Sequence, residues 1–348
     1  MITVKKEGIL LTKTSLPFEN EGILNPGAIR EGKFVHLFYR AVSVGNHSSI
    51  GYCKLNGPLA VGKRLEKPLL VPEFAFESRG MEDPRIVKIE DLYYLTYTAF
   101  DGMNAIGALA VSKDLIHFEK KGIIVPQIKQ KEFIQLMEAG GKNIDKYKKH
   151  FRDRDDLDYN EKTALLWDKN VILFPRKIEG KFYLLHRIKP DIVIVESETN
   201  FEDLTAEFWK KYLLNIDEHI VMSSKHEHEI SYIGGGCPPI ETELGWLFIY
   251  HGVHETAKGF IYCACAALLD LKNPKKEIAR LPYPLFKPEH YWELKGLVKN
   301  VCFPTGAVVF DDILYIYYGA GDEQIACASI SLSGLLTELK LYTIQDEK

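Results

Sequence analysis

A short segment, Gly80-Met81-Glu82-Asp83-Pro84-Arg85-Ile86, places two carboxylates and a guanidinium close together in the chain. Pro84 fixes its own φ and disfavours the α region for the residue before it. We therefore expect Asp83 in extended backbone at the start of the strand that follows. A similar arrangement recurs elsewhere in the chain, which favours a functional site. The same residues could instead form a surface turn with a local ion pair, and the segment alone leaves both interpretations open.

Further polar, cationic and aromatic side chains stand at related places in similar segments along the chain. These candidates are Asn25, Arg40, Asp83, Arg85, Lys169, Arg176, His186, Arg187, Tyr250, His251 and Asp322. Aromatic faces beside carboxylates and amides suit a sugar, and several cations with few acids indicate a bound anion. Each residue also has an ordinary explanation, such as an ion pair, a core histidine or a packed tyrosine. The functional hypothesis therefore rests on the whole set.

The segment His226-Glu227-His228-Glu229 is a weaker candidate. As a strand it would place both histidines on one face and both glutamates on the other, which is compatible with a metal site. A solvated loop or a substrate contact explains the same residues. We expect no metal and no other cofactor.

A repeated hairpin must position these side chains. Each copy has a turn residue and then an apolar run that ends in Tyr or His plus a small or polar residue. The copies are residues 32–41, 91–99, 180–187, 245–252 and 312–320. A shorter strand precedes each copy and a third strand follows it, and the leading strands begin at residues 25, 83, 170, 236 and 303. This order predicts an all-β fold, a five-bladed β-propeller. A β-sandwich competes, but it does not explain five copies of one hairpin. In a propeller, the leading strands line one central channel, where the candidates would converge.

Length and composition suit one catalytic domain over residues 1–348. The net charge of −4 and the absence of a basic run argue against nucleic acid, and no apolar stretch is long enough to span a membrane. The N-terminus has no signal-peptide pattern and the six cysteines form no C-x-x-C, so we expect free buried thiols and a cytoplasmic protein. We predict short helical insertions at about 129–160 and 201–211. The first of these is by default a solvated helix, and a lid or a homo-oligomer contact are the alternatives.

Several segments, in order, resemble glycoside hydrolase family 130, which comprises β-mannoside phosphorylases and β-mannosidases. They are residues 25–28, 80–86, 97–102, 173–175, 234–240, 246–252, 268–271 and 303–306. The resemblance implies a five-bladed propeller in which Asp83 is the proton donor, acting in phosphorylases through the sugar's own 3-hydroxyl. It also implies that Lys169 and His186, with the adjoining Arg187, bind phosphate. An arginine that some members carry near Ile106 is missing here, and Arg176 is a candidate replacement.

Two reaction types follow from the residues present. Inverting hydrolysis needs a carboxylate base about 6.5–9.5 Å from the acid, and Glu227, Glu229 and Glu255 are the candidate bases. Phosphorolysis needs only the acid and a set of cations for phosphate, because phosphate is already a nucleophile. The candidate cations are Lys169, His186, Arg187, Arg176, Arg85 and Arg40.

We predict an inverting β-mannoside phosphorylase that uses inorganic phosphate on a small oligosaccharide and releases α-mannose 1-phosphate. Asn25, Tyr250, His251 and Asp322 are the candidate sugar contacts. The alternatives are an inverting β-mannosidase with a glutamate base and a non-catalytic propeller that binds glycans. The mannosidic linkage, the leaving sugar, the chain length accepted and the oligomeric state stay open.

Overall fold

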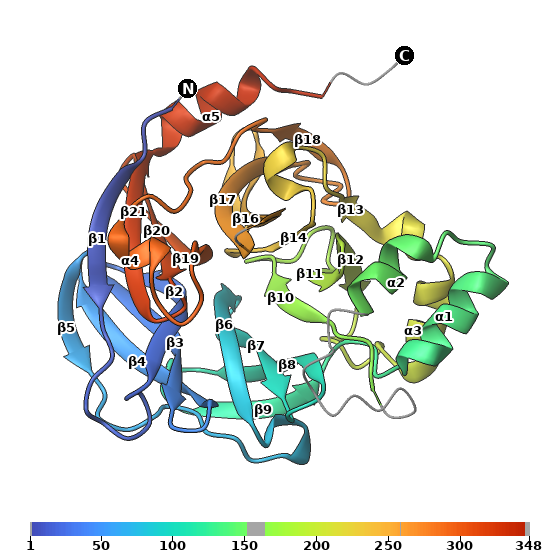
Figure 1. The fold of residues 1–348 in the computed structure, drawn as a ribbon. Coiled ribbons are helices and arrows are strands. Elements are labelled where there is room, and N and C mark those ends of the chain that lie inside the picture. The colour runs from blue at the N-terminus through green and yellow to red at the C-terminus, as the bar shows by residue number, and fades with distance from the viewer. Residues whose placement is uncertain (1, 152–163, 258, 345–348) are drawn as a thin grey trace.

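Antiparallel strands arranged around a common centre make up most of the molecule (Figure 1). This computed structural model describes residues 2–151, 164–257 and 259–344. The first strand group is β2 (Gly22–Glu31), β3 (Phe34–Ser43), β4 (His47–Asn56) and β5 (Ala60–Arg64); the second is β6 (Gly80–Ile89), β7 (Leu92–Phe100), β8 (Ala105–Ser112) and β9 (Phe118–Ile123). One parallel residue pair, Ser48 with Gly80, joins these two groups into an eight-stranded sheet.

Three more groups complete the ring. The third is β10 (Lys169–Leu173), β11 (Phe182–Ile188), β12 (Asp191–Ser197) and β13 (Ile220–Met222); the fourth is β14 (Tyr232–Gly235), β15 (Ile240–Thr242), β16 (Gly245–Thr256), β17 (Gly259–Leu269) and β18 (Glu277–Arg280). The fifth is β19 (Cys302–Phe310), β20 (Ile313–Ala320) and β21 (Gln324–Ser331), completed by the N-terminal strand β1 (Lys5–Leu11), which pairs with β21. The first strand of the chain therefore closes the last sheet.

Short helices connect and flank the sheets. They are α1 (Gln130–Ala139), α2 (Asp145–Phe151), α3 (Ala206–Leu214), α4 (Tyr291–Leu294) and α5 (Leu332–Lys340), with 3₁₀ turns η1 (Ala75–Glu77), η2 (Ile216–His219) and η3 (Glu227–Glu229). The predicted insertion is helical in α1 and α2, and its residues 152–160 lie outside the described residues. The second predicted helix is α3, which begins after the capping residue Thr205. Within the described ranges, no helix has the length and apolar character needed to cross a membrane.

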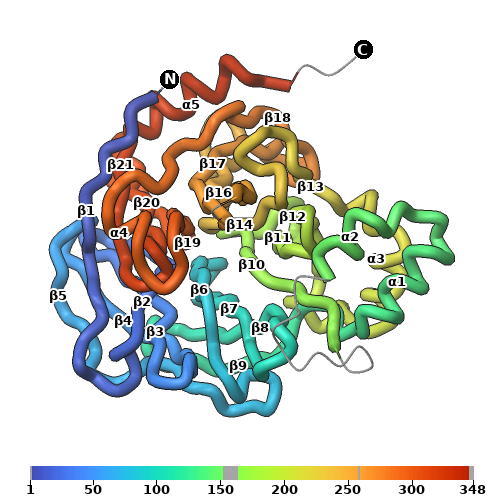
Figure 2. The backbone as a smooth tube through the Cα atoms, in the orientation of Figure 1, coloured from blue at the N-terminus to red at the C-terminus, as the bar shows by residue number. Residues whose placement is uncertain are grey.

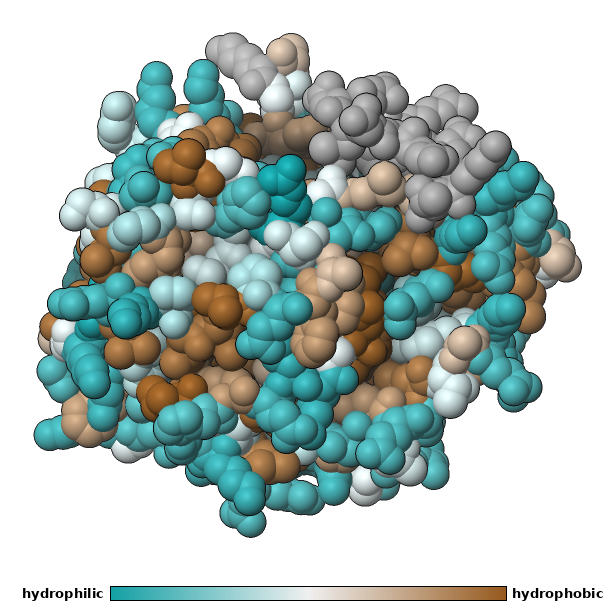
Figure 3. Space-filling model, turned by 90° about the horizontal axis from the view of Figure 1, so that it is seen from below, coloured by the Kyte–Doolittle hydropathy of each residue, from teal (hydrophilic) through white to brown (hydrophobic). Residues whose placement is uncertain are grey.

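Neighbouring sheets pack face to face around the ring, so most strands are buried on both sides. Phe174, just after β10, packs edge-to-face on Trp246 of β16 with ring centroids 5.2 Å apart. A large buried cluster joins the second and third groups to α1 and α3. Outward faces are mixed: hydrophilic and apolar side chains are interspersed on the face seen from below (Figure 3). This double burial explains why the hairpins read as continuous apolar runs rather than as alternating patterns.

The strands nearest the centre, β2, β6, β10 and β19, carry the functional segments (Figures 1 and 2). In β2, β6 and β10 the pairing register shifts at one point, a β-bulge. Asn25, Asp83 and Asn170 occupy these three bulges with φ of 51°, 50° and 55°. The expectation of extended backbone for Asp83 was therefore wrong. Asp83 lies inside β6 in the left-handed region, which aspartate and asparagine tolerate better than most residues.

The fourth group also begins earlier than expected. Residues 236–240 were predicted to lead it, but its innermost strand is β14, and Ile240 begins the separate short strand β15.

Candidate active site

A cavity of about 260 Å³ opens at the centre of the ring, where the bulges of β2, β6 and β10 meet. All five strand groups or their connections contribute to its wall. The lining residues are Asn25, Arg40, Glu82, Asp83, Trp167, Lys169, Asn170, Arg187, Lys189, Tyr232, Tyr262, Val298, Val301, Phe303 and Asp322. Six of the predicted site residues thus meet here although they are far apart in the chain: Asn25, Arg40, Asp83, Lys169, Arg187 and Asp322.

Asp83 is a buried carboxylate held by one directed hydrogen bond. Asn25 Nδ2 donates to its Oδ1 at 2.7 Å. Gly319 makes room for this contact, because a Cβ at that position would lie 2.0 Å from Asn25 Oδ1. Burial alone would raise the pKa of Asp83, but the charges of Arg85, Arg40 and Lys169 outweigh burial and lower that pKa below its usual value. Asp83 is therefore ionised at neutral pH when the cavity holds no anion.

Glu82 pairs with two of the cations in the cavity. Its carboxylate lies 2.9 Å from Arg40 NH2 and 3.6 Å from Lys169 Nζ. Arg40 also donates from Nε to Ser48. An ion pair with Glu82 or Asp83 was the ordinary explanation for Arg40 in the sequence, and the structure shows the pair with Glu82. Because Glu82 pairs with Arg40 and Lys169, it is not available to offset the positive charge on the opposite wall of the cavity.

That opposite wall is built around Arg187. Its guanidinium is buried, and burial lowers its pKa. Its NH1 lies 3.3 Å from His251 Nε2, and among the described residues its Nε has no hydrogen-bond partner. The hydroxyls of Tyr232 and Tyr262 lie 2.6 Å apart beside it. Lys189 adds a second cation 3.9 Å from the centre of the Tyr232 ring. A buried cation with an unused donor and two tyrosine hydroxyls is suited to an anion.

His251 lies behind Arg187 rather than in the cavity wall. It is fully buried, and its ring packs 4.4 Å from that of Phe303. Burial and the nearby Arg187 and Arg85 hold its pKa well below the usual value, so the imidazole is neutral. It can therefore accept a hydrogen bond from Arg187 and fix the direction of that guanidinium.

Asp322 is the third carboxylate in the cavity. Burial and the charge of Asp83 raise its pKa to about 6. Asn25 Oδ1 and Asn170 Oδ1 are buried acceptors without a partner within the described part of the chain. Together these oxygens can accept hydrogen bonds from several sugar hydroxyls.

The predicted phosphate ligand His186 does not line the cavity. Its Nδ1 lies 2.7 Å from Asp168 Oδ2 and its Nε2 lies 2.9 Å from the Tyr212 hydroxyl, so both ring nitrogens are engaged inside the third group. Arg187, the next residue of β11, points the other way because strand side chains alternate. The structure thus places Arg187 in the cavity wall and His186 outside it.

Tyr250, a predicted sugar contact, also lies outside the cavity, because its hydroxyl is bound by a buried glutamate. In four strand groups a buried glutamate accepts a hydrogen bond from a strand tyrosine and pairs with a cation, an arrangement we call the carboxylate clasp. The four clasps are Glu19–Tyr39–Arg64, Glu77–Tyr97–Lys120, Glu229–Tyr250–Arg280 and Glu293–Tyr318–Lys6. The Tyr250 hydroxyl is thus committed to Glu229, and a direct sugar contact by Tyr250 is excluded in this arrangement.

None of the three predicted bases reaches the cavity. Glu229 is fully buried in its clasp, where it also accepts hydrogen bonds from the backbone of Lys225 and His226. Glu227 is exposed on η3, and Glu255 is exposed near the end of β16. The segment 226–229 is a 3₁₀ turn and not the strand that its alternation suggested.

Two predicted phosphate-binding arginines also lie elsewhere. Arg85 is fully buried beneath the cavity and donates to the backbone carbonyls of Asp83, Gly235 and Gly236. Arg176 lies beyond the other end of β10, where its guanidinium pairs with both oxygens of Glu241 at 2.6 and 2.7 Å. It cannot replace the missing arginine near Ile106.

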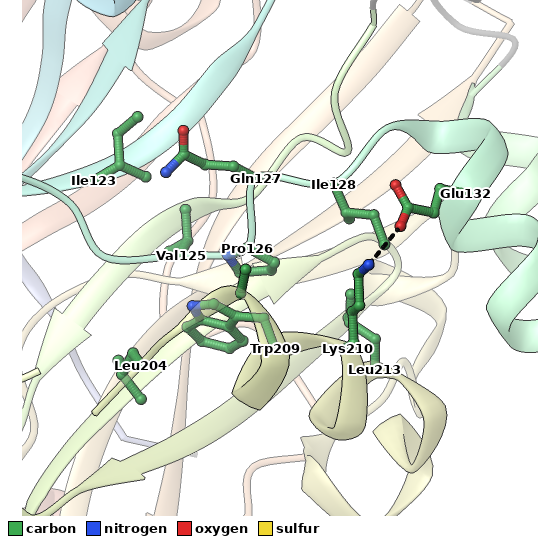
Figure 4. Close-up of a pocket in the computed structure, with 11 residues that line it drawn as sticks. Ile123, Val125, Pro126, Gln127, Ile128, Glu132, Leu204, Trp209, Lys210 and Leu213 are labelled. Atoms are coloured by element: carbon green, nitrogen blue, oxygen red, sulfur yellow. Dashed lines mark ion pairs between the residues drawn. The ribbon is translucent and has the colours of Figure 1, made fainter. Parts of the chain in front are cut away.

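The structure adds wall residues that sequence reasoning missed: Trp167, Lys189, Tyr232, Tyr262 and Phe303. The alternation along β11 was the available signal for Lys189, because residues 187 and 189 share a side. A separate groove of about 300 Å³ lies between α1, α3 and residues 123–128. In it Lys210 pairs with Glu132 at 3.4 Å and Trp209 lies beside Pro126 (Figure 4). It contains none of the predicted site residues.

Comparison with known proteins agrees with this geometry. The family pattern Glyco_hydro_130, described as beta-1,4-mannooligosaccharide phosphorylase, matches residues 12–144 and 139–341. The chain is 32% identical to a 1,2-beta-oligomannan phosphorylase of Thermoanaerobacter sp. (strain X514), covering 96% of this chain and 99% of that protein. It is 37% identical to a beta-1,2-mannobiose phosphorylase of the same strain, covering 90% and 91%.

A solved structure shows the same fold. It is the beta-1,2-mannobiose phosphorylase of Listeria innocua in complex with beta-1,2-mannobiose, with a TM-score of 0.73 at 22% identity over 98% of this chain and 100% of that chain. The family match across nearly the whole sequence and the two relatives above 30% identity agree with each other. The chain therefore belongs to glycoside hydrolase family 130, a family of enzymes that act on β-mannosides.

Proposed function

We propose that this protein is an inverting β-mannoside phosphorylase built as one five-bladed propeller domain, with each strand group forming a blade. The observation that carries the proposal is the anion-binding wall opposite Asp83. Arg187 has a buried Nε that no described residue accepts from, and Lys189, Tyr232 and Tyr262 surround it. A buried guanidinium without a carboxylate partner is unfavourable unless an anion joins it. Inorganic phosphate is the anion that this reaction needs.

The reaction follows from the two walls. Phosphate, held by Arg187 and Lys189, attacks the anomeric carbon of the terminal mannosyl unit, and the glycosidic C–O bond breaks. The leaving oxygen receives a proton that originates on Asp83, relayed through the sugar's 3-hydroxyl as the family resemblance implies. The products are α-mannose 1-phosphate and a mannoside one unit shorter. Asn25, Asn170 and Asp322 bind sugar hydroxyls.

Phosphate also makes Asp83 a better acid. In the empty cavity, the cations keep Asp83 ionised, and an ionised carboxylate cannot donate a proton. A phosphate dianion offsets those cations and raises the pKa of Asp83. Protonation of the acid is thereby coupled to the arrival of the nucleophile.

The relatives point to one linkage. The two Thermoanaerobacter proteins are named for β-1,2-linked mannosides, and we extend that linkage to this chain. A small oligosaccharide is then the only organic substrate, with phosphate as co-substrate and no cofactor in the reaction. The buried free thiols are suited to a reducing compartment such as the cytoplasm.

Hydrolysis is less well supported by the cavity. The cavity has three carboxylates. Asp83 is the acid, and Glu82 is paired with Arg40 and Lys169. The charge of Asp83 raises the pKa of Asp322, which disfavours the ionised form that a base needs. Each predicted glutamate base lies outside.

The test is product release from β-1,2-, β-1,3- and β-1,4-mannobiose, with and without inorganic phosphate. We expect mannose 1-phosphate from the β-1,2 substrate only when phosphate is present. Free mannose released at the same rate in both conditions would refute phosphorolysis. Mannose 1-phosphate released chiefly from another linkage would refute the β-1,2 assignment alone.

A further inference from the structure

A second cluster of reactive side chains lies in the fourth strand group, outside the reaction cavity. His228 Nε2, Glu229 Oε1 and Cys265 Sγ all lie within 4.8 Å of one another. Cys263, two residues earlier on β17, places its Sγ 3.8 Å from that of Cys265. We propose that these four side chains form a binding site for a thiophilic metal ion of the Zn²⁺ class, which revises the expectation of no metal drawn from the sequence.

The local fold brings the donors together. Tyr250 pairs with Cys265 and Gly252 pairs with Cys263, so the two thiols share one face of the sheet. The turn η3 lies directly over this face. A Cβ at Gly252 would lie 3.0 Å from Glu229 Cγ and 3.2 Å from Cys265 Sγ. Gly252 therefore permits the close approach of η3 that places the imidazole and the carboxylate above the thiols.

One of the proposed metal ligands is a ring nitrogen that takes part in no hydrogen bond with the described residues. His228 Nε2 is buried and has no hydrogen-bond partner in the part of the chain that the structure describes. It lies 3.8 Å from Glu229 Oε1. A buried ring nitrogen directed at a carboxylate, without a hydrogen bond, is unfavourable for the protein alone. A metal ion bound between the two would satisfy the His228 nitrogen, while Glu229 Oε1, which already accepts from the Tyr250 hydroxyl, would use a second lone pair.

Comparison with the other clasps separates structural residues from metal donors. The turns of the second and fifth groups hold the same glutamate, as Glu77 and Glu293, but the residue before it is Phe76 or Trp292. The strand position of Cys265 is Ala108 or Ala326 in those groups. The clasp therefore needs neither the imidazole nor the thiol. In the fifth group the Cys302 thiol also lies beside Glu293. Among the described residues of these three groups, the fourth is the one that adds both an imidazole and two thiols to the shared carboxylate.

The distances and charges suit the ion. Zn–S bonds of about 2.3 Å at a tetrahedral angle place two sulfurs about 3.8 Å apart, which matches the separation of Cys263 and Cys265. Binding releases one proton from each thiol to solvent. The two thiolates, Glu229 and the metal then sum to one negative charge, which Arg280 offsets in part, because it contacts Glu229 at 3.1 Å and also pairs with Glu277. Because none of the four donors lines the reaction cavity, the ion would fix η3 on the sheet and take no part in the chemistry.

The experiment uses the reduced full-length protein after treatment with a chelator, titrated with Co²⁺ in a phosphate-free buffer. Thiolate coordination gives Co²⁺ a charge-transfer absorption band. We expect one Co²⁺ per chain with this band, displacement by Zn²⁺, and a higher melting temperature with Zn²⁺. Cys265→Ala and His228→Gln should each weaken binding at least tenfold. Alanine already occupies the corresponding strand position in other groups, so Cys265→Ala is compatible with the fold.

The matched control is Cys327→Ala, which removes another fully buried free thiol, on β21. It should bind Co²⁺ like the wild type. Absence of the thiolate band from the wild type, or an equal band in Cys265→Ala, would overturn the proposal. Because His228 is partly exposed, His228→Gln keeps the test decisive if the thiol variant fails to fold. Neither outcome depends on the phosphorylase assignment.

Discussion

Two buried arginines of the central site should respond in opposite ways to the same substitution. Arg187 lines the cavity and forms no ion pair with a carboxylate of the described residues, whereas Arg85 donates to three backbone carbonyls beneath the cavity. In Arg187→Gln the phosphate loses about two charge-assisted hydrogen bonds, each contributing roughly 1.5–3 kcal/mol. The expected loss in kcat/KM for phosphate is therefore about 10²- to 10⁴-fold. The glutamine can still donate to His251.

Stability provides the contrast. Removing the buried charge of Arg187 also removes its desolvation cost, so Arg187→Gln should unfold at the same or a higher urea concentration than the wild type. In Arg85→Gln at least one buried carbonyl loses its donor, which should cost about 2–4 kcal/mol of unfolding free energy. Initial rates of mannose 1-phosphate release at varied phosphate, together with urea unfolding of both variants, test this. An unchanged phosphate dependence in Arg187→Gln, or equal destabilisation of the two variants, would refute the assignment of Arg187 to the anion site.

Three further expectations concern single side chains. Asp83→Asn should lower kcat by about 10²- to 10⁴-fold while phosphate still raises the melting temperature; loss of that thermal shift would mean that Asp83 holds the site together. Because the folded-state pKa of Asp322, about 6, exceeds its unfolded value, its ionisation opposes folding as pH rises from about 4 to 6. Asp322→Asn should therefore gain stability at pH 7, by at most about 3 kcal/mol, with a smaller gain at pH 4 in urea titrations; an equal gain at both pH values would contradict this. Tyr250→Phe should cost about 1–2 kcal/mol of stability and leave the KM for mannobiose unchanged, and a raised KM would return Tyr250 to the sugar site.

The repeated hairpins were recoverable from the sequence because each copy carries its own turn and aromatic run. The side of each strand that faces the centre was not recoverable. In a strand with one exposed face, alternation of polar and apolar residues shows which side chains point outward. Here both faces of the strands are buried, so this alternation is missing. His186 and Arg187, or Tyr250 and His251, therefore looked equally suitable. The contacts of His186 and Tyr250 come from Asp168 and Glu229, which local pattern does not connect to them.

The other wrong predictions concern the position of Arg176 along its strand and the backbone conformation of Asp83. Lys169 and Arg176 are close in sequence, but an extended chain of seven residues spans roughly 20 Å, so they lie at opposite ends of β10. The bulge at Asp83 was hidden as well, because the restriction imposed by Pro84 favours extended backbone and the positive φ arises from the strand pairing around it. What the sequence did support was the set of residues at the bulges, Asn25 and Asp83, because each stands before a proline in an otherwise apolar strand.

The pairing of β1 with β21 has a consequence for how the protein is made. Lys6 and its clasp partner Glu293 are 287 residues apart, so at about 5–20 residues per second the ribosome needs roughly 15–60 s to supply the second after the first. For that time the N-terminal strand has no partner, and once β21 emerges its free edge can pair with whichever strand arrives first. Competition between the chain's own β1 and that of a neighbouring nascent chain on the same messenger RNA is thus built into synthesis. Because the neighbour's β1 carries the same Lys6, the chain's own strand is favoured by its tethering to the same molecule and not by the Lys6–Glu293 pair.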